Sequence, residues 1–148
     1  AAAGVNASIS DLAIWLHAQL GERPEVLPPG VLKLVQSPRV DTPGEMLGPR
    51  WRRERVRAAS YALGWRVFDY SGHQLVFHAG AVQGYRALVG VIPEQGFGVA
   101  ILWNSNSGVP AGLFPRILDR QLQLDGPDWL DTHKLQMTAD RKARKPRA

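Results

Sequence analysis

Apolar residues recur at helical spacing near the start of the chain and again near its end. The first stripe lies within residues 9–20, with Ser8 and Asp11 at capping-box spacing before it and Gly21 after it. A shorter helix is expected after Pro28-Pro29, and a last one from Pro110. The apolar positions of the first and last helices are Ile9, Leu12, Ala13, Leu16 and Leu20, and Leu113, Phe114, Ile117, Leu118 and Leu122.

Between these helices the pattern changes to short runs that are typical of strands. Strands are predicted over residues 61–70, 74–78, 86–92 and 98–103. Residues 37–59 are expected to form an irregular surface excursion, and residues 79–84 a glycine-rich crossover. The last two strands are apolar at nearly every position, so both faces of the sheet should be covered. The predicted fold is α/β of the α+β type, an antiparallel sheet flanked by helices.

Composition is consistent with one folded domain. The chain has 148 residues, of which we assign 1–130 to the domain and 131–148 to a basic, disordered tail. No apolar run is long enough to span a membrane. The absence of cysteine excludes disulfides and thiolate nucleophiles. No histidine pair has metal-ligand spacing, and no phosphate-binding glycine loop occurs, so we expect neither a metal nor a cofactor.

The net charge of +5 comes from two short segments. One is the arginine cluster Arg50–Arg57, which includes Trp51, and the other is the C-terminal tail. The rest of the chain carries more acidic than basic residues. The cluster could bind phosphates with Trp51 available for stacking, or it could be a solvated loop that contacts acidic surface. We favour the loop and expect no nucleic-acid partner.

The candidate chemistry lies in His78-Ala79-Gly80, at the end of a predicted strand and shortly before Gly84. A histidine beside residues with little side chain would let a ligand lie against the strand while the imidazole contacts it. A backbone N–H there could stabilise an oxyanion. His78 could equally be a strand histidine that its neighbours satisfy. No nucleophile is evident, because Gly-x-Ser-x-Gly and Ser-x-x-Lys are both absent.

Several segments together resemble the serine β-lactamase-related family, which includes class C β-lactamases, esterases and penicillin-binding DD-peptidases. Residues 4–16 are similar to its helix after the active site, and Tyr61–Trp65 to a strand opening. His78-Ala79-Gly80 resembles the third motif, Lys-Thr-Gly or His-x-Gly, with Gly84-Tyr85 following. Leu118-Asp119 and Asp128-Trp129 look like the family's C-terminal ending. The resemblance covers roughly residues 4–130 and implies the C-terminal part of a β-lactamase/transpeptidase-like fold.

The resemblance also implies roles for individual residues. His78 would contact the substrate carboxylate or polarise the active-site hydroxyls, and Ala81 would supply an oxyanion-hole N–H. Ala79, Gly80 and Gly84 would lie along the bound substrate, a small-molecule or peptide acyl compound. Histidine in place of lysine makes an ester or peptide substrate as plausible as a β-lactam. A periplasmic or cell-envelope location is implied as well, although the residues themselves leave the compartment unknown.

The first two motifs of the family, Ser-x-x-Lys and Tyr-x-Asn or Ser-x-Asn, do not occur in the sequence. The resemblance therefore implies a missing N-terminal part that carries the nucleophile, and a sheet edge that lacks its partner. We expect the parent protein to be a serine hydrolase acting by an acyl-enzyme, and this chain alone to be inactive. The alternative is a non-catalytic ligand-binding or regulatory module on the same scaffold.

Overall fold

The computed structural model describes the backbone of residues 4–143 and the side chains of residues 4–139. The chain folds into two compact units, with the boundary between Asn104 and Ser105. The first unit holds the sheet and the predicted site, and the second holds helices. Each is described by itself.

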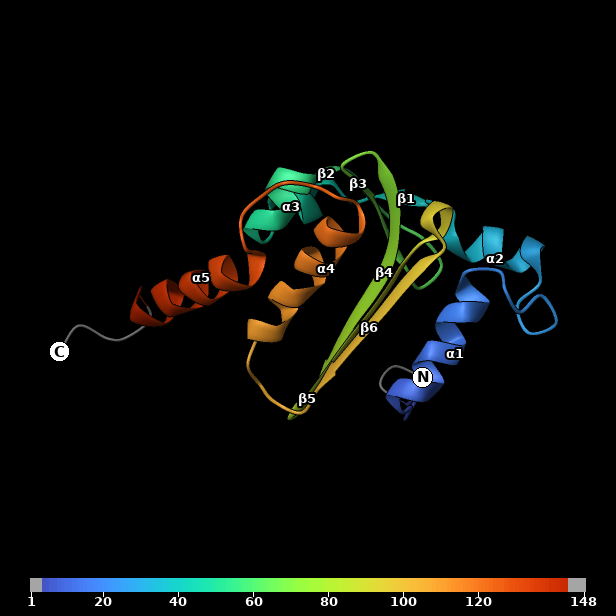
Figure 1. The fold of residues 1–148 in the computed structure, drawn as a ribbon, viewed down its shortest axis with the longest axis horizontal. Coiled ribbons are helices and arrows are strands. Elements are labelled where there is room, and N and C mark those ends of the chain that lie inside the picture. The colour runs from blue at the N-terminus through green and yellow to red at the C-terminus, as the bar shows by residue number, and fades with distance from the viewer. Residues whose placement is uncertain (1–3, 144–148) are drawn as a thin grey trace. The chain divides into compact units, whose positions relative to one another are not determined.

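The first unit contains one antiparallel sheet in the order β1-β2-β3-β4-β5-β6, so each strand lies beside the next along the chain (Figure 1). This arrangement with its helices confirms the predicted fold class. Within the described residues β6 pairs with β5 alone, and its other edge carries no strand. The elements are α1 (Ile9–Gln19), α2 (Pro29–Gln36), β1 (Val40–Asp41), η1 (Pro43–Leu47), α3 (Arg50–Arg55), β2 (Val56–Tyr61), β3 (Arg66–Tyr70), β4 (His73–Val82), β5 (Tyr85–Ile92), η2 (Pro93–Gln95) and β6 (Phe97–Trp103).

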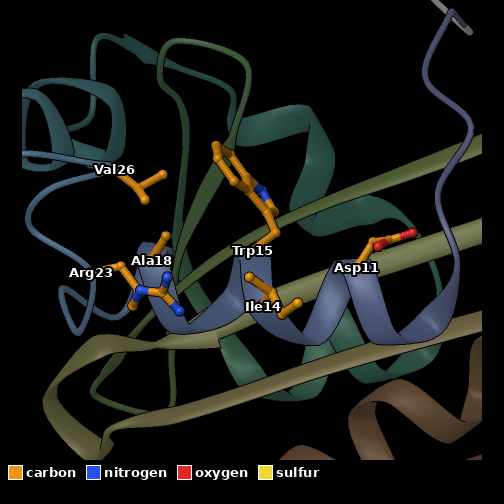
Figure 2. A pocket seen from close by; sticks show the side chains of 6 residues that line it. All are labelled: Asp11, Ile14, Trp15, Ala18, Arg23 and Val26. Atoms are coloured by element: carbon orange, nitrogen blue, oxygen red, sulfur yellow. The ribbon is translucent and has the colours of Figure 1, made fainter.

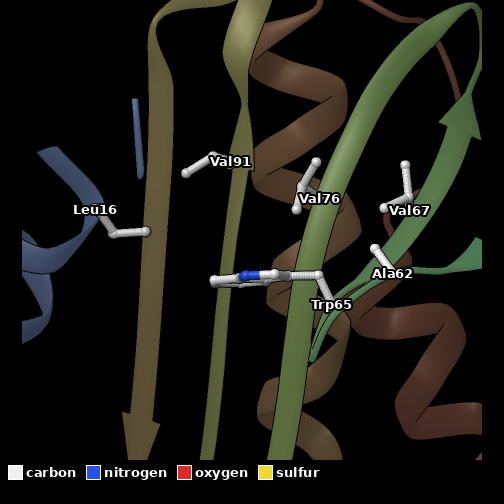
Figure 3. Close-up of a cluster of buried hydrophobic side chains, with 6 residues drawn as sticks. All are labelled: Leu16, Ala62, Trp65, Val67, Val76 and Val91. Atoms are coloured by element: carbon white, nitrogen blue, oxygen red, sulfur yellow. The ribbon is translucent and has the colours of Figure 1, made fainter. Parts of the chain in front are cut away.

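Helix α1 packs against β5 and β6 on one face of the sheet. Its start is the predicted capping box, in which the Ser8 hydroxyl accepts from the Asp11 N–H and the Asp11 carboxylate accepts from the Ser8 N–H. The backbone of β6 approaches the helix at Gly98, where an added Cβ would lie 3.3 Å from the Leu16 Cβ. The core on this face contains Leu16, Ala62, Trp65, Val67, Val76 and Val91 (Figure 3).

The other face of the sheet carries an aromatic cluster. Phe68 and Phe77 meet edge to face with ring centroids 4.8 Å apart, and Trp51 of α3 lies 6.4 Å from Phe77 and 6.0 Å from Tyr70. The Arg52 guanidinium lies 5.3 Å from the ring centroids of both Trp51 and Phe68. The arginine cluster is thus partly built into the domain, which a solvated loop would not be.

Two sequence expectations about strands were wrong. The run predicted as one strand over 61–70 is a turn followed by β3, because Ala62–Trp65 closes on itself through a hydrogen bond from the Ala62 N–H to the Trp65 carbonyl. Residues 37–59 are not an irregular excursion, since they contain β1, η1, α3 and most of β2. Pairing of β2 with β3 orders this segment, and no local pattern reveals that partner.

The predicted crossover over residues 79–84 was also wrong. Strand β4 continues through Gly80 to Val82, and the turn to β5 is reduced to two residues, ending at Gly84 with φ +79°. Gly80 stays in the strand because Ala87 of β5 pairs with it. The result is a long β4–β5 hairpin (Figure 1).

The second unit contains η3 (Val109–Gly112), α4 (Leu113–Gln121) and α5 (Trp129–Ala143). The Trp129 indole N–H donates to the Asp119 carboxylate at 2.6 Å, which joins α4 to α5. The Asp128 side chain caps α5 by accepting from the N–H groups of Leu130 and Asp131. Helix α5 therefore occupies much of the predicted disordered tail, of which residues 144–148 lie outside the described residues. The domain boundary at residue 130 stays a prediction.

Candidate active site

The two halves of β4, an inner half that ends at Phe77 and an outer half that begins at His78, have different neighbouring strands. Strand β3 pairs with β4 only as far as Phe77, whereas β5 pairs with it as far as Val82. From His78 to Val82, one edge of the strand therefore has no strand partner among the described residues. Residues 79–82 are exposed as well. The main-chain groups directed to that edge therefore have no strand partner there, and strand addition requires such an edge.

His78 stands at the first position of this open segment. Its ring is half-buried, and it lies two residues beyond the core residue Val76, on the same face of β4. The Nδ1 atom lies 2.8 Å from the Gly64 carbonyl oxygen. The imidazole is therefore held against the Ala62–Trp65 turn and is not enclosed in the packed core.

The other predicted site residues follow along the same segment. Ala79, Gly80 and Ala81 are exposed, and a Cβ added at Gly80 would meet no atom within 4 Å. Nothing in the described residues therefore requires glycine at this position, which a closely approaching ligand would. Gly84 has a separate structural role, because its positive φ allows the hairpin turn. The assignment of these residues to substrate binding stays a prediction.

Two of the other three histidines form ion-pair contacts elsewhere. His73 pairs with Glu94 at 3.1 Å, and His17 pairs with Glu22 at 2.5 Å. Within the described residues no group of three potential metal ligands occurs. Residues 4–143 also contain no helix that is both long and apolar enough to cross a membrane. The hydrogen bond that the structure records for His78 goes to a backbone carbonyl and not to a hydroxyl nucleophile.

The arginine cluster does not present the stacking surface that the sequence allowed. Trp51 is only 7 % exposed and contacts other rings. Arg52 pairs with Glu45, and burial lowers the pKa of its guanidinium while Glu45 opposes that shift. Arg50 pairs with Glu54 at 2.5 Å. These contacts favour a structural role for Trp51 and Arg52.

A shallow hollow lies on the outer side of α1 (Figure 2). Ile14, Trp15 and Val26 form its apolar part, and each side chain is more than two-fifths exposed. The charged residues beside it are Asp11, which belongs to the capping box, and Arg23, which pairs with Glu25. His78 does not line this hollow, and we do not assign the site to it.

Sequence reasoning missed Gly64, which contacts the predicted catalytic histidine. It lies in the Tyr61–Trp65 segment, which the sequence predicts as a strand opening. The available signal was a glycine between two apolar runs, which indicates a turn. That signal says nothing about a carbonyl oxygen reaching a ring 14 positions later in the chain.

Comparisons with known proteins agree on the relationship. Residues 1–123 match the Beta-lactamase family. The chain is 29 % identical over 124 residues to unguisins hydrolase ungD' of Aspergillus campestris, covering 82 % of this chain and 22 % of that protein. It also superposes on the octameric penicillin-binding protein homologue from Pyrococcus abyssi with a TM-score of 0.68 and 25 % identity, covering 80 % of this chain and 25 % of that one.

The chain spans about a quarter or less of the length of these two relatives. The matched region contains the whole β-sheet and His78. The order of the strands and the family match lead to the same identification. The chain belongs to the Beta-lactamase family and has the scaffold of a serine β-lactamase-related hydrolase.

Proposed function

We propose that this chain forms one wall of the active site of a serine hydrolase that works through an acyl-enzyme. The substrates are β-lactams, peptides or esters. The observation that carries the proposal is the outer half of β4, where a half-buried imidazole stands at the start of an exposed strand with one open edge. The relatives named as a hydrolase and as a penicillin-binding protein homologue support the same class of activity.

In this proposal the substrate lies along the open edge of β4 as an added strand. His78 contacts the substrate carboxylate or polarises the hydroxyl that attacks the acyl carbon. The backbone N–H of Ala81 donates to the oxyanion that forms during attack, and loss of one such donor typically lowers the rate by about 10²–10³-fold. The exposed backbone at Gly80 leaves room for the acyl group to approach.

The reactive serine comes from a segment outside these 148 residues. No serine in the printed sequence is followed by lysine at the third position. In the proposed reaction that serine attacks the acyl carbon and forms an ester with it, and the leaving amine or alcohol takes up a proton. Water then cleaves the ester and restores the serine. This chain by itself therefore should not turn over substrate.

The test uses the protein expressed from its complete coding sequence, beside the 148-residue chain. We expect a fluorescent penicillin or an activated ester probe to acylate the complete protein and not the shorter chain. His78→Ala should lower kcat/KM by about 10²–10⁴-fold, the usual contribution of an acid–base group. His78→Lys should recover part of that loss, because lysine occupies this position in part of the family. Gln74→Ala, at an exposed position in the otherwise buried inner half of β4, is the matched control and should leave turnover unchanged.

Turnover that is unaffected by His78→Ala would overturn the assignment of His78. A complete coding sequence without Ser-x-x-Lys, together with no acylation by either probe, would overturn the hydrolase proposal. Retention of a radiolabelled β-lactam or peptide by such a protein, with no product formed, would instead establish the non-catalytic binding module.

A further inference from the structure

We propose that Gly64 is a positioning residue for His78: its carbonyl holds the Nδ1–H of the imidazole, so that Nε2 keeps the free lone pair. The importance of this contact for turnover rests on the proposed function above. The tautomer itself does not, and it can be measured in the 148-residue chain without any reaction.

The tautomer follows from the chemistry of the contact. A backbone carbonyl can only accept a hydrogen bond, so the nitrogen 2.8 Å away must be the donor. In a neutral imidazole only one ring nitrogen carries a proton, and the partner of one nitrogen decides the state of the other. Nδ1 is therefore protonated, and Nε2 is the nitrogen that can accept a proton or a hydrogen bond from a hydroxyl group.

The carbonyl is held in place by the turn that contains it. The Ala62 N–H donates to the Trp65 carbonyl at 2.7 Å, and the Gly64 N–H donates to the Ala62 carbonyl at 3.0 Å. Ala62 and Trp65 are 6 % and 8 % exposed and belong to the core that α1 covers (Figure 3). The turn that carries the acceptor for His78 is therefore fixed on both sides by buried core residues.

Position 64 favours glycine because of its backbone dihedral angle, and not because a side chain there would clash with its neighbours. Gly64 has φ +85°, a conformation that residues with a Cβ rarely adopt. A Cβ built there would meet no atom within 4 Å. Replacement by alanine should therefore disturb the direction of the carbonyl through the backbone, without creating a clash. Asparagine is the conservative replacement, because it tolerates positive φ better than other residues with a Cβ.

The experiment is ¹⁵N NMR of the chain labelled at histidine, with the His78 signals assigned by His78→Gln. The variants are Gly64→Ala, Gly64→Asn and Leu63→Ala. Leu63→Ala is the matched control, because it shortens a half-exposed side chain of the same turn and does not require any change in the backbone dihedral angles of the turn. Backbone amide spectra establish that each variant is folded before its imidazole shifts are compared.

In the unaltered chain, Nδ1 should show the shift of a protonated nitrogen and Nε2 that of an unprotonated one. Leu63→Ala and Gly64→Asn should keep this pattern, and Gly64→Ala should move both shifts toward the average of two exchanging tautomers. A neutral His78 with its proton on Nε2 in the unaltered chain would overturn the proposal, whether or not any variant folds. An unchanged pattern in folded Gly64→Ala would overturn the role of Gly64.

Kinetics of the complete protein separate this inference from the proposed function. If both are right, Gly64→Ala lowers kcat while KM changes little, and Gly64→Asn restores most of the loss. The expected tautomer together with full activity of His78→Ala would leave the Gly64 contact standing and remove the hydrolytic role of His78. The opposite tautomer together with an inactive His78→Ala would remove the Gly64 inference and leave the hydrolase proposal standing.

Discussion

The close approach of β6 to α1 makes Gly98→Ala a sharp test of how the core is built. The new Cβ would lie 3.3 Å from the Leu16 Cβ, 3.5 Å from the Val91 Cγ1 and 3.6 Å from the Leu16 Cδ1. The nearest of these atoms is attached directly to the backbone of α1, so no change of rotamer can move it away. Helix and strand must therefore separate by a few tenths of an ångström.

Two terms of opposite sign set the magnitude of this effect. Overpacking of a core costs about 1–3 kcal/mol. Replacement of a strand glycine by alanine returns about 0.5–1 kcal/mol through the lower entropy of the unfolded chain. We therefore expect Gly98→Ala to lower the free energy of unfolding by up to roughly 2.5 kcal/mol.

The measurement is urea unfolding of the 148-residue chain, followed by tryptophan fluorescence. Gly30→Ala is the matched control, because a Cβ added there in α2 would meet no atom within 4 Å. It should raise the free energy of unfolding, by at most about 1 kcal/mol. If Gly98→Ala unfolds at the same urea concentration as Gly30→Ala, the helix does not press on β6 in the way described here.

Three further predictions concern the helices. Gly112→Ala should destabilise the second unit by about 1–3 kcal/mol in urea unfolding, because its Cβ would meet the backbone of α5 at 3.0 Å; unchanged stability would contradict that packing. Trp129→Phe should cost about 1.5–3 kcal/mol, since it deprives the Asp119 carboxylate of an indole donor; a double-mutant cycle with Asp119→Asn would show no coupling if that bond contributes nothing. At the start of α1, hydrogen bonds from Ser8 lower the pKa of Asp11. Their stabilisation is therefore present above the usual pKa of an aspartate and is lost as the pH falls through the lowered value. Ser8→Ala removes the hydroxyl but keeps the backbone N–H, which is the larger cause of the lowered pKa. It should therefore flatten only part of the acid limb of a stability profile measured by helix circular dichroism, and an unchanged limb would refute the contribution of the hydroxyl.

Features that depend on residues close together in the sequence could be predicted, whereas features that depend on distant residues could not. The capping box of α1 involves residues three positions apart, and it was correctly expected from their spacing. The extent of β4 could not be expected in the same way. Gly80 would end a strand on local grounds, but its pairing with Ala87 keeps it extended.

The candidate site shows the same division. His78 and its small neighbours are visible as a motif, because the side chains themselves carry the signal. The partner of the imidazole is a main-chain oxygen in a turn between two other strands, and every residue has such an oxygen. For the same reason the contacts of Arg52 were missed, because Glu45 and the aromatic rings come together only when η1, α3 and the sheet assemble.

The change in borders along β4 has a consequence for the exchange of its amide protons with deuterium. Strand β4 has a strand neighbour on each side only at Val76 and Phe77, so amide protection should be continuous over this short stretch. Beyond it, every second amide faces solvent, and exchange should become fast and slow in alternation toward Val82. A ligand that adds itself as a strand would abolish this alternation, and the affected amides would report its direction and register residue by residue.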